Sequence, residues 1–211
     1  MLEIVRMGME RRDRIAGIWA DAFERDPLMR WVFPDDAARR ESLRRWWSFI
    51  LDRMPAGGEL HGTRADGCVA FWQPPLGEEA ESTGHDDDPE ETSEWAVAFV
   101  ALMTGLLGDL APSRIEALGK MHQARLAEPH WYLAVLGTVP EQQSKGLGSR
   151  VLAPILDRCD RVGELVYLES SNPANVGFYR RHGFESIGAF TVGDGVLITP
   201  MVREPRPPEQ R

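Results

Sequence analysis

The segment from Trp131 to Cys159 constrains the fold more than any other part of the chain. It begins with an apolar run at 131–136 that is rich in aromatic and branched residues, and it ends with apolar residues at helical spacing over 151–159. Between them lies VPEQQSKGLGS, which carries two glycines and one lysine. The segment therefore predicts the order strand, glycine loop, helix.

This loop is suited to an anion. The first amides of a helix have no intrahelical partner and the helix dipole is positive there. Gly146 and Gly148 have no Cβ, so the backbone can approach a phosphate closely. The spacing fits neither a Walker loop nor a Rossmann fingerprint. We therefore expect a phosphate-bearing ligand of another class, and a plain helix start with two convenient glycines is the alternative.

Length and composition predict one domain. The chain has 211 residues and 43% hydrophobic content, enough for a buried core. We expect a single domain over 1–203 and a disordered tail at 204–211.

No apolar run approaches membrane-spanning length and the N-terminus lacks a secretory hydrophobic region, so we expect a cytoplasmic protein with no membrane partner. Cys68 and Cys159 fit buried positions in a reducing compartment, and no Cys/His cluster has metal-ligand spacing.

The net charge of −9 comes from one segment. Residues 78–94 hold nine acidic and no Lys or Arg residues, whereas the remaining acidic and basic residues balance at 24 each. Such a segment predicts a solvated, mobile insertion, with a lid or a lure for cationic substrates as the alternative. The same distribution argues against nucleic acid as a partner.

The N-terminal half predicts helices around a pair of strands. The expected ranges are helices at 15–23, 37–51, 95–110 and 113–126, and strands at 58–63 and 67–73. WVFPDD predicts a turn, and Ser113–Glu116 predicts a capping box that starts the last of these helices. Trp46 and Trp47 fit a core, and a homodimer interface is the alternative.

A short helix with clear boundaries follows a strand at 164–171. Asn172 is the expected N-cap, Pro173 the first helical position and Gly183 the stop. Asn175 and Tyr179 then lie four residues apart on one face.

Two further features concern the C-terminal half. A last strand pair at 185–192 and 196–202 is expected to turn at 193–195. Pro154 lies inside the helix that follows the glycine loop, where it predicts a kink or a local unwinding.

Two linked motifs in this order resemble a known family. Gln143-Ser-Lys-Gly146-Leu-Gly148 matches the acyl-CoA pyrophosphate signature Gln/Arg-x-x-Gly-x-Gly/Ala, and NPANVGFYRRHGF matches the region with the catalytic tyrosine. Over 128–203 the chain therefore resembles the GNAT superfamily of acetyl-CoA-dependent N-acetyltransferases. HWYLAVLGTVPEQQSKGLGS, YLESSNPANVGFYRRHGF and FERDPLMRWVFP look most like the branch that includes puromycin N-acetyltransferase.

The resemblance implies a fold and a function. The fold is α/β, with a mostly antiparallel sheet of about six to seven strands flanked by helices and a parallel pair splayed at the acyl-CoA site. The function is transfer of acetyl from acetyl-CoA, without a metal, to the primary amine of a small molecule by direct attack on the thioester. A peptide or protein amine as acceptor, or a non-catalytic acyl-CoA sensor, is the alternative.

The resemblance also implies roles for single residues. The implied acyl-CoA ligands are the backbone of Gly137, Thr138 and Val139 along pantetheine, Gln143, Ser144, Lys145, Gly146, Leu147, Gly148 and Ser149 at the pyrophosphate, and Asn172 or Asn175 at the pantetheine arm. Tyr179 is the implied acid that protonates the CoA sulfur, with a packed aromatic as the alternative. A backbone amide within 136–139 is expected to stabilise the oxyanion.

The general base and the acceptor contacts stay open. His130, just before the central strand, and Glu169, on the neighbouring strand, are the two base candidates, and a structural histidine is the alternative for His130. Glu24, Asp26 and Trp31, in and after the FERDP turn, are expected to contact the acceptor.

Overall fold

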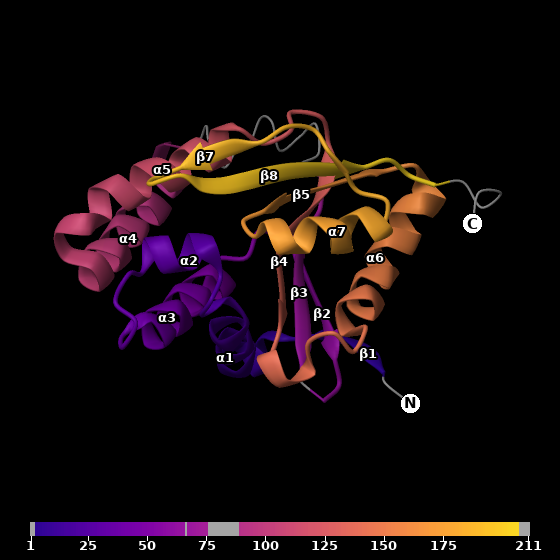
Figure 1. Ribbon diagram of the computed structural model, residues 1–211, viewed down its shortest axis with the longest axis horizontal. Coiled ribbons are helices and arrows are strands. Elements are labelled where there is room, and N and C mark those ends of the chain that lie inside the picture. Colours follow the sequence, from indigo (N-terminus) through magenta and orange to yellow (C-terminus); the bar gives the residue numbers. More distant parts are fainter. Residues whose placement is uncertain (1–2, 66, 76–88, 207–211) are drawn as a thin grey trace.

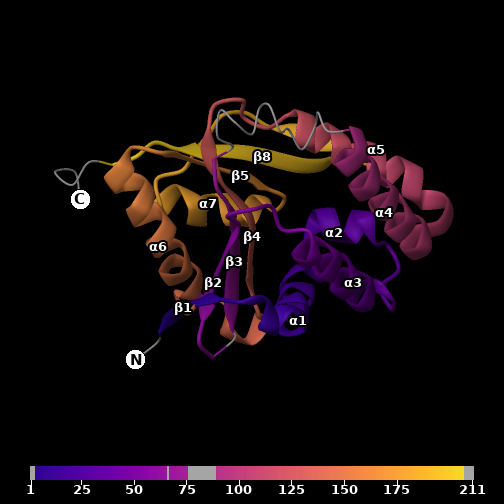
Figure 2. The ribbon, with the colours of Figure 1, turned by 180° about the vertical axis from the view of Figure 1, so that it is seen from behind.

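The computed structural model describes residues 3–65, 67–75 and 89–206, and Figures 1 and 2 show it from two sides. The helices are α1 (Arg12–Phe23), α2 (Pro27–Val32), α3 (Arg39–Asp52), α4 (Pro89–Leu107), α5 (Ala111–Gln123), α6 (Leu147–Val162) and α7 (Pro173–Arg181). The strands are β1 (Ile4–Met7), β2 (Glu59–Thr63), β3 (Cys68–Gln73), β4 (His130–Thr138), β5 (Leu165–Ser170), β6 (Glu185–Ser186), β7 (Phe190–Val192) and β8 (Val196–Arg203).

One open sheet forms the centre of the molecule (Figure 1). Its strand order is β1-β2-β3-β4-β5-β8-β6, with β7 paired to β8 off this path. Neighbouring strands are antiparallel except β4 and β5, which run parallel. The mixed α/β fold with a parallel pair is therefore confirmed, and in the described residues the sheet has eight strands where about six to seven were expected.

The differences lie at the edges of the sheet. The sequence analysis did not anticipate β1, a four-residue strand that pairs with β2. The strand expected at 185–192 is split into β6 and β7, which pair separately with β8. The turn at 193–195 joins β7 to β8 as expected, and both of its glycines have positive φ angles.

Two apolar clusters hold helices on the sheet. The larger cluster contains buried residues from α1 to α5, and the second contains buried residues from α6 and α7. Trp19 on α1 is fully buried in the first, and its Nε1 donates to the Val69 carbonyl on β3 at 3.1 Å. Trp46 and Trp47 are also buried there, which confirms their core assignment. Because both tryptophans are buried within the chain, they do not support a homodimer interface, and a homodimer stays a prediction.

Two expectations about the helices were wrong. The WVFPDD turn is partly helix α2, whose N-cap Asp26 accepts from the amides of Leu28 and Met29. The capping box is absent, because α5 begins at Ala111 and the Ser113 hydroxyl donates to the Leu110 carbonyl.

Two segments depart from their expected conformation. Helix α6 continues through Pro154 without an unwound turn. Residues 89–94 of the expected acidic insertion belong to α4, and its residues 78–88 lie outside the described part of the chain. The tail beyond 206 lies outside it too.

One helical stretch within the described residues, Glu94–Gln123, is long and apolar enough to cross a membrane by length and composition alone. No stretch of this kind was predicted from the sequence. It spans α4 and α5, and a 3₁₀ turn at Gly108–Leu110 separates these two helices. Cytoplasmic localisation therefore stays a prediction.

A buried ion-pair cluster ties β2 to α6. Glu59 accepts from Arg158 Nη1 at 2.8 Å, and its other oxygen lies 2.8 Å from His61 Nε2. Burial alone would raise the pKa of Glu59, but the bonds from Arg158 and His61 outweigh it and lower the pKa to about 2. Because the folded pKa lies below the ordinary value, this stabilisation is present above about pH 4.5 and is lost as pH falls towards 2.

We expect Glu59→Gln to lower the free energy of unfolding by about 2 kcal/mol at pH 7, because Arg158 loses its carboxylate partner. Urea unfolding of both proteins checks this value, and the difference should shrink from pH 5 to pH 3. Glu116→Gln, which breaks an exposed pair with Lys120, is the matched control and should change nothing measurable. Equal stability of wild type and Glu59→Gln at pH 7 would contradict the assignment.

Candidate functional site

The glycine loop ends where α6 begins. Gly146 is the N-cap of α6 with a φ of 74°, and Ser144 has a φ of 61°, so both lie in the left-handed region. Gly146 adopts this conformation easily because it has no Cβ. No side chain caps the first turn of α6, so its amides are open to an anion.

Two exposed side chains hold the loop to its own backbone. Gln143 Nε2 donates to the Thr138 carbonyl at 3.1 Å, and Lys145 Nζ donates to the Glu141 carbonyl at 2.8 Å. The Lys145 charge therefore stays close to the loop, where solvent screening keeps its effect on a phosphate modest.

Strands β4 and β5 pair at one end and part at the other. The ladder joins 130–132 to 165–167 and goes no further. Consecutive residues of β3 face Leu133 and Val135, which leaves Ala134 as a bulge in β4. The backbones of the parallel pair therefore part beyond Tyr132 and Tyr167, next to this bulge, and we call this opening the gap.

Alternate β4 amides face this gap. The Val139 amide donates to the Gly67 carbonyl at 3.0 Å, so it faces away from the gap. Strand alternation turns Gly137 the same way and turns Leu136 and Thr138 to the gap. Of the three positions expected along pantetheine, the geometry therefore favours Thr138 and adds Leu136.

Gly137 lets α1 approach the strand. A Cβ there would lie 2.7 Å from Trp19 Cδ1 and 3.1 Å from Ala22 Cβ. A larger residue would push α1 off β4, so the packing of α1 accounts for this glycine.

Tyr179 lies on α7 in a buried aromatic cluster. Its ring centroid lies 5.2 Å from that of Phe178 and 5.9 Å from that of Phe184. Burial, followed by the charges of Asp26 and Cys68, raises the pKa of Tyr179 well above its ordinary value. The phenol therefore keeps its proton at neutral pH, so it is present as a donor.

Asn172 and Asn175 differ in their freedom to bind a ligand. Asn172 Oδ1 accepts from the Ala174 amide at 3.0 Å, so it caps α7 as expected. The Asn175 side chain is exposed one turn before Tyr179. Asn175 is therefore the better candidate for the pantetheine arm.

Asp26 joins the start of α2 to the end of β5. Besides capping α2, its Oδ2 accepts from the Ser171 hydroxyl at 2.8 Å. Burial raises the pKa of Asp26, and these hydrogen bonds partly offset that rise. The charge of Asp26 raises the pKa of Tyr179, so Asp26 lies near this tyrosine. Asp26 also has a structural role as the N-cap of α2.

The other two acceptor candidates lie at the end of α1 and on α2. Glu24 is half-buried at the end of α1. Trp31 Nε1 donates to Asp194 Oδ2 at 3.1 Å, which links α2 to the β7–β8 turn. Trp31 also lines a surface pocket of about 410 Å³, formed by Arg25, Pro27, Arg30, Trp31, Pro34, Asp36 and Arg39.

Glu169 is the centre of a buried polar cluster. Its side chain is 3% exposed, and it accepts from the hydroxyls of Tyr132 at 2.6 Å and Tyr167 at 3.2 Å. Arg125 Nε lies 3.5 Å from Glu169 Oε1, and Arg125 Nη2 donates to the Tyr132 hydroxyl at 3.0 Å. Burial raises the pKa of Tyr132 and Tyr167, so both hydroxyls stay protonated as donors.

His130 lies at the closed end of the strand pair. It pairs with Leu165, whereas Glu169 comes two residues after the last paired position of β5. The His130 Nδ1 lies 2.6 Å from the Glu128 carbonyl, so Nδ1 carries the hydrogen and Nε2 is the free acceptor. Burial lowers the pKa of His130, so the ring is neutral at pH 7.

The gap, the loop and the tyrosine helix all fall within one stretch of sequence, and residues 117–205 match the family model described as the acetyltransferase (GNAT) domain. This match places a GNAT acetyltransferase domain in the C-terminal part of the chain. This finding confirms the family resemblance, while the resemblance to the puromycin branch stays a prediction.

Curated and solved proteins resemble parts or all of the chain. An uncharacterised N-acetyltransferase of Schizosaccharomyces pombe is 36% identical over 78 residues, which cover 36% of this chain and 32% of that protein. The alignment thus spans about a third of that relative's length.

Solved structures share the fold over nearly the whole chain. One is titled histone acetyltransferase HPA2 and related acetyltransferase from Corynebacterium glutamicum, with a TM-score of 0.69, 21% identity and 98% coverage of each chain. Another is an agmatine N-acetyltransferase with a TM-score of 0.60, 17% identity and coverage of 96% and 99%. A third is arylalkylamine N-acetyltransferase 2 from Aedes aegypti, with a TM-score of 0.61, 10% identity and coverage of 97% and 99%.

The GNAT domain contains site residues that the sequence did not single out. Arg125, Tyr132 and Tyr167 come from α5, β4 and β5 and meet only at Glu169. Ser171 meets Asp26 across 145 residues of sequence. No local spacing signals these contacts. In the described residues no group of three or more His, Cys, Asp or Glu side chains could hold a metal ion.

Proposed function

We propose that the protein is an acetyl-CoA-dependent N-acetyltransferase that acts on the primary amine of a small molecule. One observation carries the proposal: the open gap between β4 and β5, the uncapped start of α6 and Tyr179 all lie within the region that matches the GNAT domain. GNAT acetyltransferases use acetyl-CoA, which has both a pyrophosphate and an extended pantetheine arm.

The described residues fit both parts of acetyl-CoA. The pyrophosphate lies on the loop from Gln143 to Ser149, where the amides of the first α6 turn are open. The pantetheine arm fills the gap as an added strand would, against the backbone of Leu136 and Thr138. Asn175 contacts the arm from α7.

The reaction is direct attack of the amine on the thioester carbonyl. A C–N bond forms, and the negative charge that develops on the carbonyl oxygen is stabilised by the Leu136 amide. The C–S bond then breaks, and Tyr179 gives its proton to the departing thiolate. The amine proton leaves through the polar cluster around Glu169.

Glu169 serves this proton path better than His130. Its carboxylate lies at the start of the gap, whereas His130 is six residues before Leu136, or about 20 Å along an extended strand. Tyr132 and Tyr167 hold the carboxylate in one orientation.

We expect Glu169→Gln to lower kcat/KM about tenfold and His130→Gln less than about threefold. The glutamine keeps the size of the side chain but cannot take up a proton. Initial rates from pH 6 to pH 9 check this, with the acetyl-CoA Kd as a control for folding. The reverse order of effects would make His130 the base.

The acceptor side favours a cationic small molecule. Glu24 ends α1, Asp26 caps α2, and the Glu169 carboxylate lies where β4 and β5 part, so the proposed approach of an amine runs near three carboxylates. The solved neighbours include proteins named for acetylation of agmatine and of arylalkylamines, which supports a small amine. The resemblance to the puromycin branch supports an aminonucleoside or a related compound.

Release of free thiol from acetyl-CoA tests the proposal across puromycin, aminoglycosides, polyamines, amino acids and an N-terminal peptide. Turnover with one small-amine class supports it. Turnover with the peptide alone moves the acceptor to a protein amine, and binding of acetyl-CoA without turnover across all classes favours a sensor.

A further inference from the structure

Helix α7 packs on the first turn of α6 through two side chains one helical turn apart. A Cβ at Gly148 would lie 3.1 Å from Phe178 Cζ, so the phenyl ring rests against the glycine. One turn later His182 Nε2 lies 2.8 Å from Ser149 Oγ. The two rings of α7 also contact each other, with centroids 4.8 Å apart. Helix α7 thus contacts the first turn of α6, at the end of the phosphate loop.

The His182–Ser149 contact has two hydrogen-bond arrangements. If Nε2 has no hydrogen, the serine hydroxyl donates to it and presents only oxygen lone pairs to the loop. If Nε2 carries a hydrogen, it donates to Ser149 Oγ and the hydroxyl hydrogen is free. Only the second arrangement lets Ser149 donate to a phosphate oxygen, because a phosphate has no hydrogen to offer at neutral pH.

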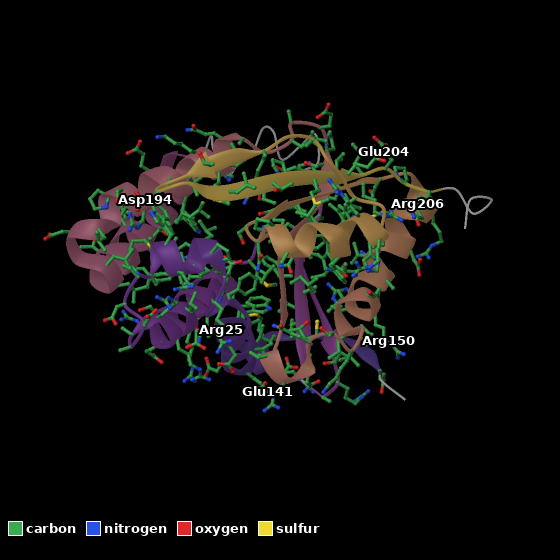
Figure 3. The ribbon with its side chains drawn as sticks, in the orientation of Figure 1. Arg25, Glu141, Arg150, Asp194, Glu204 and Arg206 are labelled. Atoms are coloured by element: carbon green, nitrogen blue, oxygen red, sulfur yellow. The ribbon has the colours of Figure 1, made fainter. Side chains whose placement is uncertain are left out.

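Three arginines lie near enough to His182 to affect its pKa. Arg181 follows it on α7, and Arg203 Nε on β8 donates to the His182 carbonyl at 2.9 Å. The guanidinium of Arg203 is paired with Asp160 on α6 at 2.7 Å. Arg206 lies towards the end of α6 away from the labelled Arg150 (Figure 3). Burial, then Arg181, Arg203 and Arg206, lowers the pKa of His182.

We propose that His182 is a positioning residue for the acyl-CoA pyrophosphate: a hydrogen on its Nε2 turns the Ser149 hydroxyl towards the phosphate, and the charged ring, which always carries that hydrogen, gives the tighter binding. The inference rests on the proposed acyl-CoA site. In this role Ser149 donates its hydroxyl hydrogen to the phosphate. The contact also connects the phosphate loop to α7, the helix that carries Tyr179.

The sign of the pH dependence follows from the ring form that a bound phosphate favours. The free protein has a neutral ring at pH 7 and a charged ring only in acid. A bound pyrophosphate favours the charged ring, so binding takes up a proton and affinity rises as pH falls. Dephospho-CoA is the appropriate probe because it lacks the 3′-phosphate, which titrates in the same range.

Calorimetric titration of dephospho-CoA from pH 5.5 to pH 8 tests the inference on four variants and wild type. We expect His182→Ala and Ser149→Ala each to raise the Kd about tenfold at pH 6, and the double variant to be no worse than either. His182→Gln keeps a donor near the Nε2 position, so its Kd should stay within about threefold of wild type but lose the pH dependence. Ser113→Ala on α5 is the matched serine control.

Two results overturn the inference alone. One is a Kd of His182→Ala within twofold of wild type, and the other is the same pH dependence in wild type and His182→Gln. Failure of wild type to bind either dephospho-CoA or CoA overturns the proposed acyl-CoA site itself, and with it the role of His182.

Discussion

Replacing Tyr179 by Phe should lower kcat at least about 100-fold while the acetyl-CoA Kd stays within about threefold. The change removes only the hydroxyl, and the ring can keep its contacts with Phe178 and Phe184. Without the proton from Tyr179 the thiolate must leave unprotonated, which slows the collapse step. Steady-state thiol release and calorimetric binding on the same preparation measure the two quantities separately.

The pH profile gives a second test of the same assignment. Burial raises the pKa of Tyr179, so wild-type kcat should not fall on the basic side below about pH 10. Unchanged turnover in Tyr179→Phe would remove it as the acid and leave the packed-aromatic alternative.

Replacing Gly148 by Asp should weaken acetyl-CoA binding at least about 100-fold. The new Cβ would lie 3.1 Å from Phe178 Cζ, which is tight, and the carboxylate would repel the pyrophosphate at the start of α6. Thermal unfolding with and without 1 mM acetyl-CoA measures this, because a ligand that binds only the folded state raises Tm.

Gly105→Asp is the matched control for this variant. Gly105 is an exposed glycine in α4, and a Cβ there meets nothing within 4 Å. It carries the same change in charge away from the loop, so its Tm should rise with acetyl-CoA as much as that of wild type. An equal rise in Gly148→Asp would contradict the placement of the pyrophosphate.

The C-terminal half could be predicted because its signals are local. The N-cap Asn172 and the proline at 173 mark the start of α7, and the left-handed Gly183 marks its end. The glycine loop likewise lies directly between its strand and its helix. Such short-range rules do not depend on the rest of the fold.

The N-terminal half was predicted less well because its short elements depend on distant contacts. The four residues of β1 form a strand only through pairing with β2, which is some 50 residues away in the sequence. The six residues of α2 depend on the Asp26 cap, which accepts a hydrogen bond from Ser171, the residue after β5. Ser113 was misread because Pro112 fits the first helical turn, so the helix starts earlier than the capping pattern implied.

The site shows the same division. The loop residues from Gln143 to Ser149 were found by their spacing. By contrast, the sequence does not show that the amide of Leu136, and not that of Gly137, faces the gap. That direction follows from the hydrogen bond between the Val139 amide and the Gly67 carbonyl. The cluster at Glu169 unites residues from three elements whose separation in sequence carries no pattern.

Calorimetric titration of acetyl-CoA into the wild-type protein tests the central claim most directly. The account predicts one site per chain with a micromolar Kd, competition by free CoA and loss of the signal in Gly148→Asp. A folded protein that shows no binding heat, and no rise in Tm with 1 mM acetyl-CoA, would contradict the acyl-CoA site.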